Sequence, residues 1–97
     1  MQLPVAVTRS GSQPLSESGV TRNISSGGVL FTAHHEMDVG GAIEYAITLN
    51  SQQEPHVVLR CIGKVLRYEK VASREPAHEA FAVAATLERY EFIRPER

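Results

Sequence analysis

Short runs of alternating hydrophobic and polar residues recur along this chain and predict an all-β fold. In the clearest run, large apolar side chains occupy every second position, at Ile43, Tyr45, Ile47 and Leu49. Such alternation is typical of a strand that buries one face. The same pattern, read with the turn signals between the runs, predicts six strands near residues 3–9, 19–24, 28–33, 42–49, 57–70 and 81–87.

The segments between these runs are rich in Ser, Gly and Pro and predict the connections. Residues 10–18 contain Pro14 and are expected to form an exposed loop. Residues 88–93 are expected to form one short helical turn, which Pro95 ends. Gly63 interrupts the inward row of the longest strand, and a glycine there is typical of the bend that closes a barrel.

Six closely spaced strands with almost no helix between them leave two architectures, an antiparallel sandwich and a barrel. A barrel removes exposed strand edges, which favours it in so short a chain. The predicted fold is therefore a small antiparallel six-stranded β-barrel with a short C-terminal helical turn. The 97 residues are expected to form one domain, residues 1–97, around a single modest core.

Charge and cysteine content exclude several classes of protein. A formal net charge of −1 argues against a binder of nucleic-acid polymers or anionic membranes, which needs an excess of Lys and Arg. No apolar run approaches the roughly 20 residues that a membrane-spanning helix needs. The lone cysteine, Cys61, and the absence of a signal-peptide pattern predict a cytoplasmic location, with Cys61 in the core.

The turn between the second and third predicted strands gathers residues that can contact a ligand. Asn23 and Ser25 have side chains that bond either to the local backbone or to a bound molecule. Gly27 and Gly28 allow a sharp bend and a close approach of another group. Two interpretations carry equal weight here: the turn only shapes a hairpin, or it also contacts a ligand.

The order Asn23, Ser25, Gly28 resembles the N-x-S-x-x-G signature of the PilZ domain. PilZ domains are small bacterial β-barrels, many of which bind cyclic di-GMP. The likeness continues at Gly40-Gly41, at Gly63-Lys64-Val65 and in the strand near residues 81–87. The resemblance implies a β-barrel that acts as a regulatory domain in bacterial second-messenger signalling.

Family members that bind cyclic di-GMP also carry an R-x-x-x-R stretch before the first barrel strand. A planar guanidinium grips a phosphate through two hydrogen bonds and stacks on a guanine face. This chain has no two arginines at that spacing. Either the arginine segment lies upstream of Met1 and this chain is a fragment of a longer protein, or the protein lacks the segment.

The nucleotide-binding residues that the resemblance implies are Asn23, Ser25 and Gly28, with Arg22 and Arg9 as local sources of positive charge. Each missing charge-assisted bond removes about 1.5 to 3 kcal/mol of binding free energy. Two functions remain open: a cyclic di-GMP receptor whose binding is weakened or lost, and a PilZ-like module that binds a protein partner and no nucleotide. A protein partner is expected in either case.

No pattern in the chain predicts catalysis. Ser, His and Asp occur without a nucleophile elbow or any other catalytic spacing. His34, His35, Glu36 and Asp38 form a polar cluster, but adjacent residues point in different directions and no further pair completes a metal site. A solvated loop is the favoured interpretation, and the chain is predicted to be no enzyme and to hold no metal or cofactor.

Overall fold

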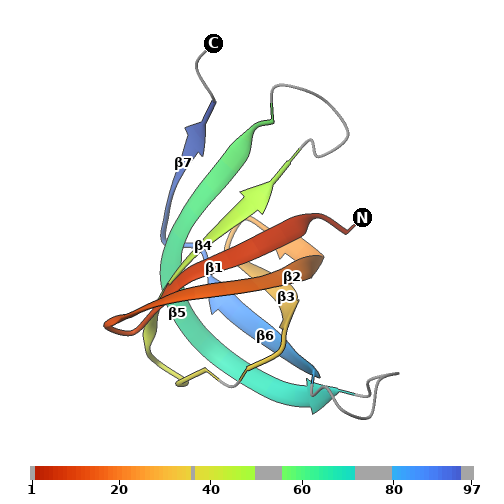
Figure 1. The fold of residues 1–97 in the computed structure, drawn as a ribbon, viewed down its shortest axis with the longest axis vertical. Helices are drawn as coiled ribbons and strands as arrows, with labels where there is room; N and C mark the ends of the chain where they lie inside the picture. Colours follow the sequence, from red (N-terminus) through yellow and green to blue (C-terminus); the bar gives the residue numbers. More distant parts are fainter. Residues whose placement is uncertain (1, 36, 50–55, 72–79, 95–97) are drawn as a thin grey trace.

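A computed structural model describes residues 2–35, 37–49, 56–71 and 80–94, which form seven β-strands (Figure 1). Their bounds are β1 Pro4–Ser10, β2 Gln13–Ser25, β3 Gly28–Ala33, β4 Ala42–Thr48, β5 Val58–Val71, β6 Ala80–Thr86 and β7 Arg89–Ile93. Within the described ranges there is no helix of the length and apolarity that crossing a membrane requires.

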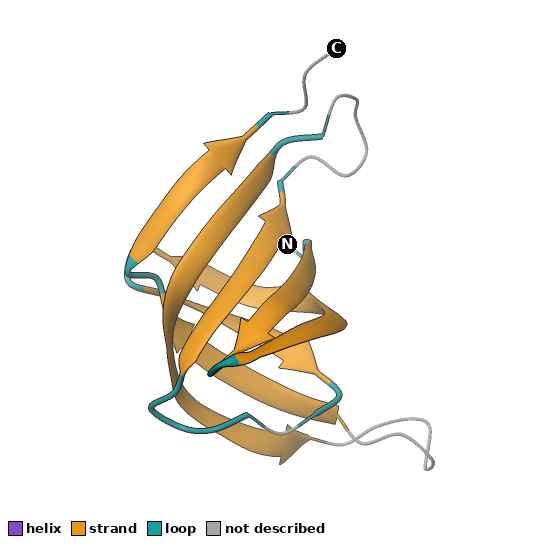
Figure 2. Ribbon diagram, turned by 60° about the vertical axis from the view of Figure 1, so that its left-hand side comes forward, coloured by secondary structure: helices purple, strands orange, loops and turns teal. Residues whose placement is uncertain are grey.

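Six of the strands close into an antiparallel barrel, which confirms the predicted six-stranded β-barrel. The order around the barrel is β4-β1-β2-β3-β6-β5, and pairing of β4 with β5 completes the circle. Two sheets make up its wall (Figure 2). We call β2-β1-β4-β5-β7 sheet A and β2-β3-β6-β5 sheet B. The two long strands β2 and β5 belong to both sheets, so the wall is continuous.

The core is built from the inward rows that the alternation predicts. Ile43, Tyr45 and Ile47 on β4 are fully buried. Phe31 on β3 stacks on Tyr45 with ring centroids 5.6 Å apart, which joins sheet B to sheet A through the middle of the barrel. Cys61 is also buried, as predicted, and its burial raises the pKa of the thiol to about 11.

Residues 10–18 do not form the exposed loop that their composition predicts. The chain turns at Gly11 and Ser12, and β2 begins at Gln13. This part of β2 pairs with β1 although its inward positions include Glu17 and Gly19 in place of a row of large apolar residues. The loop prediction was wrong because pairing with β1, and not a hydrophobic pattern of its own, makes this segment a strand.

Residues 88–93 do not form the predicted helical turn. Residues 89–93 are instead extended as β7, which pairs with residues 58–62 of β5. That part of β5 bonds to β4 on one side, whereas β6 pairs only with the later part, residues 65–71. The first half of β5 therefore has a free edge, and β7 occupies it. The helix prediction was wrong because this partner lies far away in the sequence.

Candidate functional site

The outer face of sheet B carries one row of residues that crosses four strands. From β2 to β5 the directly opposed residues are Asn23, Leu30, Ala84 and Arg67. The two ends of the row are polar, and its middle is apolar. Three strand spacings of about 4.8 Å separate the ends, so the row is about 14 Å wide.

This row lies in a shallow pocket of about 220 Å³. The pocket brings Asn23, Ser25 and Gly28 together with Leu66 and Arg67. The floor between them consists of small or apolar residues of β3 and β6, namely Gly28, Val29, Leu30, Ala84 and Ala85. A flat apolar floor between an amide and a guanidinium suits a ligand that has a planar ring and an anionic group.

Irregular strand pairing at both ends of the row shapes the pocket. The register of β2 shifts between Thr21 and Asn23, which leaves Arg22 as an extra residue opposite β3. The register of β5 shifts between Val65 and Arg67, which leaves Leu66 as the extra residue opposite β6. A bulge of this kind re-aims the side chains that follow it, and such bulges are common beside binding sites.

The bulge on β5 explains why sequence analysis missed Arg67. Val65 points into the core, so strict alternation would place Arg67 on the same buried face. With Leu66 inserted, Arg67 is exposed and stands opposite Ala84 on the outer face. It forms no ion pair within the described ranges, so its guanidinium is available to a bound anion.

Asn23 and Ser25 differ in what their side chains do. The Ser25 hydroxyl donates a hydrogen bond to the Gly28 carbonyl oxygen at 3.3 Å, which closes the turn between β2 and β3. Asn23 is exposed, and its amide makes no hydrogen bond to the part of the chain that the structure describes. The Ser25 side chain therefore shapes the turn, whereas the described residues leave the Asn23 amide unbonded and exposed to solvent.

Gly28 has a packing role that is independent of any ligand. A Cβ atom at this position would stand 2.8 Å from the carbonyl oxygen of Ala85, so the missing side chain lets β3 lie close to β6. Its backbone is not in the left-handed region, which among the described residues contains only Gly11 and Gly40. Gly27 has open space around its Cα, and a side chain there would meet nothing within 4 Å.

The two arginines expected near the turn lie in different places. Arg22 is exposed on the bulge next to Asn23, although it is not among the residues that line the pocket. Arg9 is on β1, where its Nε lies 3.1 Å from a carboxylate oxygen of Glu44. The pocket residues do not include Arg9 either.

The histidine cluster after β3 is tied to β2. The backbone N–H of His34 donates to the Glu17 carboxylate at 3.1 Å, and Nδ1 of His35 contacts the other oxygen of the same carboxylate. Glu36 lies outside the described residues. Among the residues that are described, no group of three or more His, Cys, Asp or Glu side chains is placed to hold a metal ion.

The fold and the turn place the chain in the class of small closed antiparallel β-barrels that carry N-x-S-x-x-G at the β2–β3 turn. The sequence model of the PilZ domain matches residues 1–88. The chain therefore belongs to the PilZ domain family, a family of regulatory and binding domains that is not known for enzymes. No curated protein and no solved structure matches the chain.

Proposed function

We propose that this domain is a cyclic di-GMP receptor in which Arg67 of β5 replaces part of the missing arginine motif. The row on the outer face of sheet B carries the proposal, because it puts an amide and a guanidinium, neither bonded to another described side chain, at opposite ends of an apolar floor. The family supports it, since many PilZ domains bind this nucleotide.

Each part of the row matches one chemical group of the ligand. The Asn23 amide has two N–H donors and one acceptor oxygen, which suit the edge of a guanine base. Leu30 and Ala84 offer an apolar surface to the face of the base. Arg67 provides the planar fork that binds a phosphate through two hydrogen bonds.

The remaining residues have supporting roles in this proposal. Ser25 and Gly28 shape the turn that presents Asn23, and Arg22 supplies a second positive charge from the bulge. The nucleotide-binding role of Arg9 stays a prediction from the sequence. In the structure its guanidinium pairs with Glu44, so we give Arg9 no role in the proposed site. The buried, unpaired Cys61 fits the cytoplasmic location expected of such a receptor.

Isothermal titration with cyclic di-GMP tests the proposal. Arg67→Ala removes a charge-assisted bond and is expected to weaken binding about 10- to 150-fold. Asn23→Ala removes a neutral hydrogen bond and is expected to cost about 1 kcal/mol, or roughly fivefold. Arg89→Ala is the matched control, because it removes one exposed arginine outside the pocket and should leave the affinity unchanged.

Two results would contradict the proposal. An equal loss of affinity in Arg67→Ala and Arg89→Ala would assign the effect to net charge. A flat titration with both this chain and the full-length gene product would exclude the receptor and favour a module that binds a protein partner without nucleotide.

A further inference from the structure

The last strand, β7, lies outside the closed barrel and has one unpaired edge. It bonds to β5 on one side, and no other described strand pairs with it. It also lies beyond residues 1–88, which the PilZ family model matches. Figure 1 shows β7 along the first half of β5, at the end of sheet A. An open strand edge of this kind is a template for pairing with another chain.

One face of β7 carries two exposed aromatic side chains. Tyr90 is 58% exposed and Phe92 is 60% exposed, and their rings meet edge to face with centroids 6.0 Å apart. They stand opposite Cys61 and Leu59 of β5, whose side chains face the core. Tyr90 and Phe92 thus extend the core-facing side of sheet A past the barrel.

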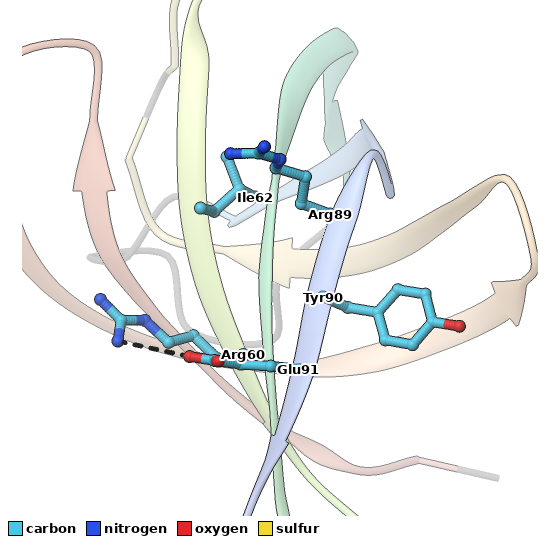
Figure 3. Close-up of a pocket in the computed structure, with 5 residues that line it drawn as sticks. All are labelled: Arg60, Ile62, Arg89, Tyr90 and Glu91. Carbon is cyan, nitrogen blue, oxygen red and sulfur yellow. Dashed lines mark ion pairs between the residues drawn. The ribbon is translucent and has the colours of Figure 1, made fainter.

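The other face of β7 carries opposite charges two residues apart. Glu91 lies 3.8 Å from Arg60 of β5, and Arg89 forms no ion pair within the described ranges. An open groove of about 500 Å³ lies over the paired strands β5 and β7 and is lined by Arg60, Ile62, Arg89, Tyr90 and Glu91. In Figure 3, Tyr90 points away from the Arg60–Glu91 pair.

We propose that β7 pairs with β7 of a second copy of this chain, antiparallel and with the two-fold axis at Tyr90. In this register Arg89 of each copy stands opposite Glu91 of the other, so two ion pairs form on one face. On the other face, the two Tyr90 rings are opposite each other and the two Phe92 rings flank them. Sheet A then runs continuously from one barrel into the next.

The charges on β7 favour the register with its axis at Tyr90, and they favour a second copy of this chain as the partner. Moving the axis to Glu91 would place the two Glu91 carboxylates opposite each other, which is unfavourable. With the axis at Tyr90, the single sequence Arg89-Tyr90-Glu91 is complementary to itself in charge and in shape. A C2 interface requires this self-complementarity, because the same residues meet on both sides of the two-fold axis. Pairing with an unrelated strand would not require it. The proposal does not depend on nucleotide binding.

Charge reversal tests the proposal through sedimentation velocity over a wide range of protein concentration. The unmodified chain is expected to show a concentration-dependent monomer–dimer equilibrium, because a single strand pair is a small interface. Arg89→Glu and Glu91→Arg each place like charges opposite each other and should raise the dimer dissociation constant at least about tenfold. Lys64→Glu makes the same charge change as Arg89→Glu at an exposed site on β5 and should leave the dimer dissociation constant unchanged.

Mixing the two variants separates pairing from misfolding. An equimolar mixture of Arg89→Glu with Glu91→Arg restores both ion pairs, so the mixture should dimerise more tightly than either variant alone. The double variant, Arg89→Glu with Glu91→Arg, should dimerise like the unmodified chain. A chain that is monomeric at every concentration, or a mixture that stays monomeric, would overturn the proposal.

Discussion

At the scale of single residues, two glycines are required by the space around them and not by their backbone angles. A Cβ atom at Gly63 would stand 1.9 Å from the carbonyl oxygen of Thr86, and one at Gly19 would stand 1.9 Å from that of Thr32. Neither glycine has a positive φ. Gly63 lies next to the point where β5 passes from β4 to β6, as expected for the bend that closes the barrel.

Gly63→Ala is therefore expected to destabilise the domain strongly. The added methyl group would force two backbones apart, and overpacking of this kind costs about 1 to 3 kcal/mol or more in the free energy of unfolding. Gly27→Ala is the matched control, because its methyl group meets nothing within 4 Å. Urea denaturation followed by circular dichroism measures both. Equal unfolding midpoints in the two variants would contradict the packing role of Gly63.

At the scale of elements, the first half of β2 is joined to the segment after β3 by a buried carboxylate. The side chain of Glu17 is only 2% exposed, and it accepts the N–H of His34 and contacts the ring of His35. The hydrogen bond to Glu17, with its negative charge as a second cause, raises the pKa of His35 above the ordinary value of 6.5. A polar residue at an inward strand position thus has its partners within the fold.

This contact makes the stability of the segment depend on pH in a definite direction. Because the pKa of His35 is raised in the folded state, the contact stabilises the fold fully below the unfolded pKa of about 6.5. The stabilisation is lost as the pH rises through the folded-state pKa. An NMR titration of the His35 ring should give a pKa above 6.5, and Glu17→Gln should return it toward that value.

The Glu17→Gln variant keeps an oxygen that can accept the N–H of His34, so it isolates the charge. Glu91→Gln removes a carboxylate from β7 and should leave the His35 titration unchanged. A native His35 pKa at or below 6.5 would contradict the predicted contact.

At the scale of the whole molecule, stability depends on contacts through the middle of the barrel. The Phe31–Tyr45 stack joins the two sheets, and both side chains are fully buried. The Tyr45 hydroxyl donates to the carbonyl oxygen of Thr86 at 3.0 Å, so this polar group is satisfied inside the core. A domain of this size has a total stability of only about 5 to 15 kcal/mol.

Phe31→Ala is expected to remove about 3 to 5 kcal/mol of that stability, since it deletes a large buried ring and leaves a cavity. The urea midpoint should fall sharply, and probes of the two sheets should lose their signals together because one core serves both. Val39→Ala removes an exposed apolar side chain and should change the midpoint little. A small effect of Phe31→Ala, or separate transitions for the two sheets, would contradict a single shared core.

The fold class, the inward rows of side chains and the family could all be predicted from the sequence alone. Alternation identified the buried faces at Ile43, Tyr45 and Ile47, and N-x-S-x-x-G pointed to the barrel. These features are local, because the pleat of a strand places every second side chain on one face whatever its neighbours are.

Three features could not be predicted from the sequence: the start of β2, the strand formed by residues 89–93, and the position of Arg67 on the same outer face as Asn23. Each of these depends on a partner strand. Pairing with β1 makes the polar start of β2 a strand, and pairing with the free edge of β5 holds residues 89–93 in the extended conformation. The bulge opposite β6 turns Arg67 to the outer face. A strand edge takes its partner from elsewhere in the chain, so local patterns do not contain this information.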